Sequence, residues 1–168
     1  AGAILAESFN YQYKTNFKVL MPCNLFGPND NYDANNSHFF PSLIKKIHFA
    51  KKNKKKKIVL WGSGKPLREL MYVDDFADAS LFFLNKKTKE TIINVGSGNE
   101  MSILDYAKFI MNEMNYKCSI KFDRSKPDGT PRKILNSSIA KQYGWKPKIG
   151  IKKGFNLTFN HFLKLLNI

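Results

Sequence analysis

The stretch "KIVLWGSGKPLRELMYVDDFADASLFFLNK", residues 57–86, carries the alternation that decides the fold. "KIVLWGSG" is typical of a strand that ends in a glycine turn, and "RELMYV" is typical of a second strand. Asp74 is placed to cap a helix that runs through "DDFADASLFFLNK". Further along the chain, "TIINVGSG" repeats the strand-then-glycine pattern. Alternating strands and helices predict an α/β fold, with ligands expected where strand ends meet loops.

The N-terminal side continues this alternation. "AGAILAESFNYQYKTN" spaces its apolar residues as a helix does, and "FKVLMP", residues 17–22, is typical of a short apolar strand. The polar stretch after it, residues 23–37, is longer than a compact fold usually tolerates without a function, so we expect a binding segment there. Ser37 is placed to cap a helix through "HFFPSLIKKIHFAKK".

The C-terminal side adds a helix, a strand and two more helices. Ser102 and Asp105 form an S-x-x-D start to the helix "SILDYAKFIMNEM". "CSIKF" predicts a further strand, and "SSIAKQYGW" predicts a short helix. The last predicted helix, "GFNLTFNHFLKLL", places five apolar residues on one face: Phe155, Phe159, Phe162, Leu163 and Leu166.

The composition limits the classes of protein to which this sequence can belong. A length of 168 residues with 43% hydrophobic content fits one globular domain or part of one. No apolar run approaches the ~20 residues of a membrane span, and we see no secretory signal pattern, so we expect a soluble, cytoplasmic protein. Cys23 and Cys118 have neither metal-site spacing nor a Cys-x-x-Cys pairing, which argues against a zinc site and a disulfide framework.

The net charge of +15 raises the possibility of nucleic-acid binding. Most cations are lysine, and they are dense in "KKIHFAKKNKKKK", residues 45–57, as expected of a solvated helix face. We therefore do not expect a nucleic-acid partner. The chain has three arginines, Arg68, Arg124 and Arg132, and each marks a place where a planar, two-pronged contact could matter.

The segment "KPDGTPRK", residues 126–133, combines cations with residues that restrict or reshape the backbone. Its two prolines fix φ and its glycine permits positive φ, so we expect a preset turn and not a flexible linker. Read locally, it is equally compatible with a solvated turn and with a rigid loop that faces an anion.

Several other features leave their function open when read alone. The two Gly-Ser-Gly triplets follow strands but lack the third glycine of a dinucleotide fingerprint, which favours simple tight turns. No tyrosine has a lysine four residues later, so the Tyr-Lys pair of short-chain reductases is absent from these residues. His38 could act as an acid or base or be structural. Trp61 could be a core residue or could stack on a base or sugar.

Five motifs in order reveal a family: "MPCNLFGPNDNY", "NNSHFFPSLIKK", "VLWGSGKPLREL" with "YVDD", "INVGSG" and "KPDGTPRK". Together they resemble the GDP-L-fucose synthase family, extended short-chain dehydrogenases/reductases also called GDP-4-keto-6-deoxy-D-mannose epimerase-reductases. The resemblance covers essentially the whole chain. "VDD" and "NVGSG" are generic to sugar-nucleotide enzymes, whereas "KPDGTPRK" and "NSHFFP" are more specific.

The resemblance implies an NADPH-dependent reaction in two stages. C3 and C5 of GDP-4-keto-6-deoxy-D-mannose are epimerised, and the C4 ketone is then reduced to give GDP-L-fucose. His38 matches the family histidine that acts as the acid in epimerisation and also lies at the cofactor. Pro22, Cys23, Asn24 and Leu25 match the segment that lies along the nicotinamide end of the cofactor.

The resemblance also implies a substrate site. Trp61, Arg68, Asp128 and Lys133 match positions that hold the GDP-sugar, so the loop "KPDGTPRK" is expected to clamp the nucleotide. Lys46 stands where many relatives carry an arginine, which removes the two-pronged contact at that position. We still expect Lys46 to bind substrate.

The family's glycine-rich cofactor loop, its Tyr-x-x-x-Lys residues and its cysteine base all precede the part that this chain resembles. We therefore expect a C-terminal portion of an NAD(P)-binding Rossmann-like reductase, inactive alone and homodimeric as an intact enzyme. Residues 1–30 would end the Rossmann half, and residues 31–168 would form mainly the smaller substrate-binding part with interleaved Rossmann elements. The alternatives are another nucleotide-sugar epimerase or dehydratase, or a non-catalytic binding module.

Overall fold

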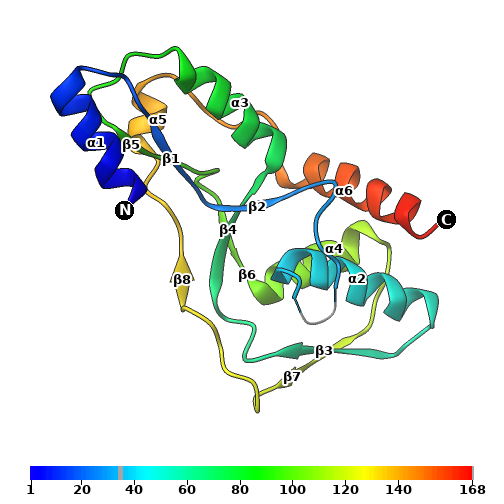
Figure 1. Cartoon of the computed structure of the whole chain (residues 1–168). Helices are drawn as coiled ribbons and strands as arrows, with labels where there is room; N and C mark the ends of the chain where they lie inside the picture. The colour runs from blue at the N-terminus through cyan, green and yellow to red at the C-terminus, as the bar shows by residue number, and fades with distance from the viewer. Residues whose placement is uncertain (34–35, 168) are drawn as a thin grey trace. The chain divides into compact units, whose positions relative to one another are not determined.

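The computed structural model describes residues 1–33 and 36–167, and in it strands and helices alternate as predicted (Figure 1). The α/β class is confirmed, because both two-stranded sheets pair their strands in parallel. The chain divides into two compact units, each built from three separate segments. Unit 1 comprises Ala1–Leu25, Glu69–Asn99 and Ile134–Ile151, and unit 2 comprises Phe26–Arg68, Glu100–Lys133 and Lys152–Ile168.

Unit 1 contains a parallel strand pair, and its strands register from Val19 opposite Ile92 to Pro22 opposite Val95. Its elements are α1 (Gly2–Tyr13), β1 (Val19–Pro22), α3 (Val73–Leu84), β5 (Ile92–Val95) and α5 (Ser138–Gln142). Apolar side chains from all three segments form one buried cluster: Cys23, Met71, Ala79, Phe83, Ile93, Val95, Ala140 and Trp145.

Unit 2 contains a second parallel pair, β3 with β7, whose register runs from Lys57 opposite Ser119 to Trp61 opposite Asp123. Helix α2 packs against both α4 and β3. The core includes edge-to-face ring pairs, with Phe40 4.7 Å from Phe26 and 5.8 Å from Tyr106 between ring centroids. The elements are α2 (Phe39–Lys52), β3 (Lys57–Trp61), β6 (Glu100–Ser102), α4 (Ile103–Glu113), β7 (Ser119–Asp123), β8 (Arg132–Lys133) and α6 (Ile151–Leu165).

Two strands carry the chain across the boundary between the units: β2 (Asn24–Phe26) and β4 (Leu67–Tyr72). The strand order is β2-β4-β6, and β8 also pairs with β4. The β4–β8 pairing is parallel and sets Arg68 opposite Lys133. The rigid loop of the sequence therefore ends as a short strand beside the first residues of β4.

One of the three predicted helix caps is confirmed. The Ser102 Oγ accepts a hydrogen bond from the Asp105 N–H at 3.0 Å and caps α4. The predicted caps Ser37 and Asp74 are wrong: α2 begins after His38 and α3 begins after Tyr72, neither with a side-chain cap. Asp74 lies instead inside the first turn of α3, where a carboxylate still interacts favourably with the helix dipole.

Two boundaries also differ from the prediction. The polar stretch 23–37 was expected to be a loop, but it contains the three-residue strand β2. Helix α6 begins at Ile151, three residues earlier than expected, so Gly154 lies inside it and is buried beside Phe155. No helix among residues 1–33 and 36–167 is long and apolar enough to cross a membrane.

Candidate functional site

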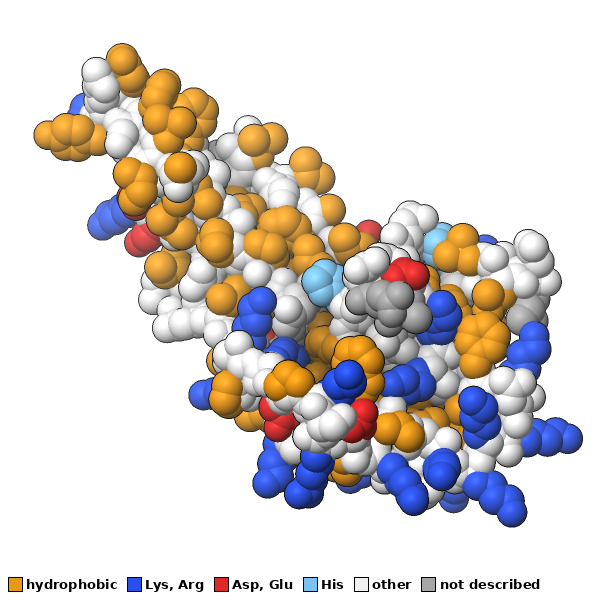
Figure 2. Space-filling model, turned by 60° about the horizontal axis from the view of Figure 1, so that its bottom comes forward, with side chains coloured by type: hydrophobic (Ala, Val, Ile, Leu, Met, Phe, Trp, Pro, Cys, Tyr) orange, Lys and Arg blue, Asp and Glu red, His pale blue; other side chains and the backbone are white. Residues whose placement is uncertain are grey.

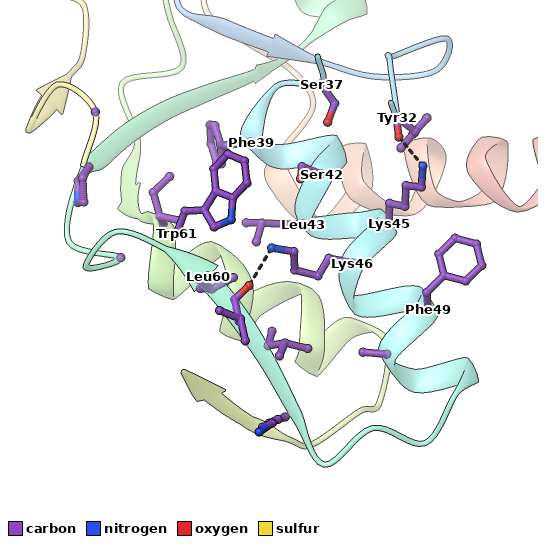
Figure 3. Close-up of a pocket in the computed structure, with 18 of the residues that line it drawn as sticks. Tyr32, Ser37, Phe39, Ser42, Leu43, Lys45, Lys46, Phe49, Leu60 and Trp61 are labelled. Carbon is purple, nitrogen blue, oxygen red and sulfur yellow. Dashed lines mark hydrogen bonds between the residues drawn. The ribbon is translucent and has the colours of Figure 1, made fainter. Parts of the chain in front are cut away.

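A cavity of about 1270 Å³ opens within unit 2, bounded by α2 on one side and by β3 on the other (Figure 3). The turn after β3 and the loop "KPDGTPRK" contribute to one end of it. The lining includes Tyr32, Phe39, Lys45, Lys46, Phe49, Lys55, Lys56, Lys57, Trp61, Arg68 and Asp128. Four of the five predicted substrate residues, Lys46, Trp61, Arg68 and Asp128, are thus brought to one cavity.

Aromatic side chains form part of the cavity wall. Trp61 is 64% exposed at the end of β3, where the alternation of the strand buries Ile58 and Leu60 and leaves Trp61 on the open face. Phe39 enters from the start of α2 (Figure 3). The Lys126 ammonium lies 5.7 Å from the centre of the Trp61 ring. Such a surface can stack against a planar base or sugar ring.

Cations surround the same cavity. Lys45 and Lys46 leave adjacent positions of α2 in different directions (Figure 3). The Lys45 Nζ donates to the Tyr32 carbonyl at 2.8 Å, and the Lys46 Nζ donates to the Val59 carbonyl at 2.7 Å. Burial lowers the pKa of the Lys46 ammonium. Lys45 thus links α2 to the polar loop at Tyr32, and Lys46 links α2 to β3 at Val59. Both side chains also place an amine near any ligand in the cavity.

Arg68 and Asp128 lie at the end of the cavity near the glycine turn. The Arg68 Nη1 donates to the Thr130 carbonyl at 2.6 Å and to the Leu67 carbonyl at 2.8 Å. The Asp128 carboxylate accepts hydrogen bonds from the backbone N–H and the hydroxyl of Ser63, at 2.7 Å and 2.6 Å. These bonds fix both side chains before any ligand arrives.

Lys133 and His38 belong to unit 2 but are not among the residues that line the cavity. Lys133 is exposed on β8, opposite Arg68 in the strand register. His38 is exposed at the N-terminal end of α2, between Ser37 and Phe39, which both line the cavity. Burial raises the pKa of the Asp30 carboxyl, and the nearby His38 is among the groups that oppose this rise.

The predicted cofactor segment Pro22–Leu25 lies in unit 1. Pro22 is exposed at the carboxyl end of β1, while Cys23 packs into the core and donates its N–H to the Val95 carbonyl at 3.1 Å. The Asn24 Nδ2 donates to the Glu69 carbonyl at 3.0 Å. Burial raises the pKa of the Cys23 thiol to about 12, and the charge of Glu69 adds to this rise. The Cys23 thiol is thus a core group and not an acid or base near neutral pH.

Sequence reasoning missed Ser63, whose two donors hold Asp128 in place. It also missed Tyr32 and Lys45, which line the cavity from a polar loop and from α2. The surface of this unit carries many Lys and Arg side chains, as Figure 2 shows. The lysine density of the sequence signalled that surface, but a lysine that turns inward looks the same in sequence as one that is solvated.

Comparisons with known proteins give a consistent match. A family model described as the NAD dependent epimerase/dehydratase family matches residues 1–96. The chain is 40% identical over 164 residues to the putative GDP-L-fucose synthase 2 of Arabidopsis thaliana and 39% identical over 173 residues to the GDP-L-fucose synthase of Escherichia coli K12. Each alignment covers 98% of this chain and, respectively, 50% and 54% of the relative. The chain thus spans about half the length of these relatives.

Solved structures agree with this match. A GDP-L-fucose synthetase from Naegleria fowleri bound to NADP superimposes with a TM-score of 0.83 and 28% sequence identity. The superposition covers 98% of this chain and 54% of that one. The likeness extends over both units of the chain.

Proposed function

Because the chain belongs to the NAD dependent epimerase/dehydratase family, we propose that it forms the substrate-binding part of a GDP-4-keto-6-deoxy-D-mannose epimerase-reductase that makes GDP-L-fucose. The observation that carries the proposal is the unit 2 cavity, which gathers a stacking surface at Trp61 and cations at Lys46 and Arg68. A nucleoside diphosphate sugar presents the complementary features, a planar base and two phosphates. Hydrogen bonds to such charged groups contribute roughly 1.5–3 kcal/mol each.

Each predicted substrate residue has a proposed place in this site. Trp61 offers its ring to the base or sugar, and Arg68 and Lys46 offer their charges to the diphosphate. Lys133 extends the row of cations along β8, next to Arg68. Asp128 was expected to hold the GDP-sugar itself, but its hydrogen bonds to Ser63 support an indirect role in which it orders the loop "KPDGTPRK".

The proposed chemistry begins with epimerisation. The C4 ketone acidifies the neighbouring C3–H and C5–H bonds, so a base can remove each proton and an acid can return one to the opposite face. We assign the acid to His38, whose imidazole is exposed at the start of α2 beside the cavity. An imidazole can both donate and accept a proton, which suits this role.

Reduction of the C4 ketone requires NADPH, which supplies the hydride. Pro22, Cys23, Asn24 and Leu25 would hold its nicotinamide end, and we also assign a cofactor-binding role to His38. The fit is supported by β1, which runs parallel to β5 and ends at the exposed Pro22, since cofactors of open parallel sheets bind at carboxyl strand ends. Because these 168 residues contain no Tyr-x-x-x-Lys, the proton donor to the C4 oxygen is not expected among them.

We also propose that the intact enzyme is a homodimer, with α1 at its interface. None of the residues in α1 is buried, and Ile4, Leu5 and Phe9 are 64%, 59% and 40% exposed. Exposed hydrophobic side chains also gather there in Figure 2. Contiguous apolar surface of this kind marks interaction sites. A cytoplasmic location is supported by Cys23 and Cys118, which are both free.

Nucleotide binding can be tested on the 168-residue chain. Trp61 is exposed in the cavity, whereas the second tryptophan, Trp145, is 3% exposed in the unit 1 core. GDP should therefore cause a saturable change in tryptophan fluorescence that Trp61→Phe abolishes. The affinities for guanosine and for inorganic pyrophosphate, measured separately, show how much the base and the diphosphate each contribute to GDP binding. Absence of any saturable GDP binding, by fluorescence and by calorimetry, would contradict the proposal.

Catalysis can be tested in a chimera that joins residues 1–168 to the N-terminal half of the Escherichia coli relative. The chimera should oxidise NADPH when GDP-4-keto-6-deoxy-D-mannose is added. The same reaction in D₂O should place deuterium at C3 and C5. A folded chimera that binds GDP but does neither would leave the chain as a binding module.

A further inference from the structure

One side chain joins two turns of unit 2 that lie far apart in sequence. Asp128 belongs to the loop "KPDGTPRK", and Ser63 belongs to the turn after β3. The Ser63 N–H donates to the Asp128 Oδ1 at 2.7 Å, and the Ser63 hydroxyl donates to the Oδ2 at 2.6 Å. Both carboxylate oxygens are therefore engaged by a single residue. We call this pair, Ser63 with Asp128, the clasp.

The turn is shaped around the clasp. Gly62 has a φ of +70°, and a Cβ added to it would lie 2.2 Å from the Asp128 Oδ1. Only glycine combines that backbone conformation with such a close approach. The first glycine of this Gly-Ser-Gly triplet thus has a geometric purpose that a generic tight turn does not require.

The same loop fixes Arg68 at its other end. The Thr130 carbonyl accepts from the Arg68 Nη1, and the Pro131 carbonyl accepts from the Leu67 N–H at 2.8 Å. A Cβ on Gly129 would lie 3.0 Å from the Arg68 Nη2. Among the residues that the structure describes, no acceptor bonds to the Arg68 Nε or Nη2, so these atoms can donate to a ligand.

We propose that the clasp positions Arg68 for an anionic ligand, with Ser63 and Asp128 acting through Arg68 and not by touching the ligand. This inference rests on the proposed function, because the ligand is the GDP part of the substrate. The clasp closes one end of the loop, the Thr130 carbonyl holds Arg68, and Gly129 leaves space for its guanidinium. Moving the loop would therefore move the guanidinium.

The hydrogen bonds of Asp128 support a positioning role for this residue. Both of its carboxylate oxygens accept hydrogen bonds from Ser63, so the turn after β3 holds the side chain in place. The Ser63 hydroxyl and N–H hold the pKa of Asp128 below its usual range, and Lys65 and Arg124 add to this effect. Since the folded pKa is depressed, the clasp is stable above the ordinary pKa of an aspartate and is lost as the pH falls through the folded value.

The test is a double-mutant cycle on GDP affinity, measured by calorimetry on the 168-residue chain. Ser63→Ala removes one donor of the clasp and should weaken GDP binding roughly 3- to 10-fold. In an Arg68→Ala background the same substitution should change the affinity less than about twofold, because the residue through which it acts is gone. Ser63→Thr keeps both donors and should restore the affinity of the wild type.

The matched control is Asp123→Ala. Asp123 also accepts hydrogen bonds from a serine N–H and hydroxyl, those of Ser125, but this bond pair is local and does not reach Ser63. Its loss should leave GDP affinity unchanged. Equal losses from Ser63→Ala with and without Arg68 would show a direct role in ligand contact and would overturn the proposal.

A second measurement needs no ligand. Amide hydrogen exchange at Ser63 should be slow in the wild type and at least about tenfold faster in Asp128→Ala, which removes both acceptors of the clasp. Unchanged exchange would overturn the clasp itself. If exchange responds but the wild-type chain binds no GDP, the proposed function fails, and the binding role of the clasp fails with it.

Discussion

Unit 1 and unit 2 use their charged side chains for different purposes. In unit 1 the buried carboxylates bind the chain to itself: Glu69, 0% exposed, accepts the N–H of Gly98 at 2.7 Å and of Leu135 at 2.9 Å. Asp75, 2% exposed, accepts two further N–H groups, those of Lys148 and Ile149. These carboxylates join segments that are distant in sequence, and they leave no charge free for a ligand.

In unit 2 the charge is mostly positive and faces a cavity or solvent. Unit 2 holds 20 Lys and Arg against 7 Asp and Glu, a net +13, whereas unit 1 holds 8 against 6, a net +2. Six of the unit 2 cations line the cavity: Lys45, Lys46, Lys55, Lys56, Lys57 and Arg68. The net positive charge of the chain therefore lies almost entirely in one unit.

This difference predicts that substitutions should separate into two classes. Changes at the buried polar groups of unit 1 should lower stability and leave the affinity of the folded chain intact. Changes at the cavity of unit 2 should lower affinity or rate and leave stability intact. A variant that shows the effect expected of the other unit would break that separation.

The largest effect is expected at His38. In the chimera, His38→Asn should slow epimerisation roughly 10²- to 10⁴-fold, the usual contribution of a general acid, while GDP binds as before. Deuterium incorporation at C3 and C5 measures this step directly. His161→Asn, on α6, is the control and should retain the exchange rate. Unchanged exchange in His38→Asn would remove this residue from the mechanism.

The two cysteines should differ by about 100-fold or more in alkylation rate, because only the thiolate reacts. Cys23 is buried in unit 1 with a pKa raised to about 12, whereas Cys118 is partly exposed in unit 2. Iodoacetamide at pH 8, followed by mass spectrometry, should label Cys118 first. Labelling of Cys23 should accelerate as the pH rises toward its pKa. Equal alkylation rates for Cys23 and Cys118 in the folded chain would show that the reagent reaches the unit 1 core.

Gly96→Ala should destabilise unit 1 by about 1–3 kcal/mol through overpacking. Its Cβ would lie 2.4 Å from the Glu69 Oε1 and 2.9 Å from the Ser137 Oγ. Urea unfolding measures the loss of free energy, and GDP titration of the folded protein should show unchanged affinity. Gly150→Ala is the matched control, since a Cβ there meets no atom within 4 Å. A loss of affinity without a loss of stability would reverse the roles assigned to the two units.

The smallest effect is expected for Arg68→Lys, which keeps the charge and removes the planar fork. GDP affinity should fall roughly 3- to 10-fold, because a point charge cannot reproduce a two-pronged contact with phosphate. Arg124→Lys, outside the cavity lining, serves as the control. Calorimetry gives both dissociation constants. If the two variants bind alike, the arginine is retained at position 68 for another reason.

Regular elements with strong local patterns could be predicted from the sequence. The strands β3 and β4 and the helices α2, α3 and α4 follow from apolar periodicity and glycine turns, and the cap at Ser102 follows from a local S-x-x-D pattern. The strand β2 has only three residues inside a polar stretch, too few for a period to appear. The caps expected at Ser37 and Asp74 were wrong because these side chains stand one and two residues away from the actual N-cap residues, His38 and Tyr72.

The candidate site could be predicted in part. Lys46, Trp61, Arg68 and Asp128 come from different segments, and the resemblance placed them together, as the cavity does. The clasp could not be predicted, because Ser63 and Asp128 are 65 positions apart and each sits in a turn that explains its residues locally. The orientation of Lys46 was also hidden, because Lys45 and Lys46 line the cavity whereas Lys51 and Lys52 of the same helix do not, and the sequence does not distinguish the two pairs.

The position of Lys46 has a consequence for covalent labelling. Its ammonium is half-buried, its Nζ donates to the Val59 carbonyl, and burial lowers its pKa. A lowered pKa raises the fraction of neutral amine, the form that attacks aldehydes to give imines. Periodate-oxidised GDP carries two aldehydes on its opened ribose and would deliver them into the cavity. Because Lys46 lines the cavity and burial lowers its pKa, we expect such a reagent to label it.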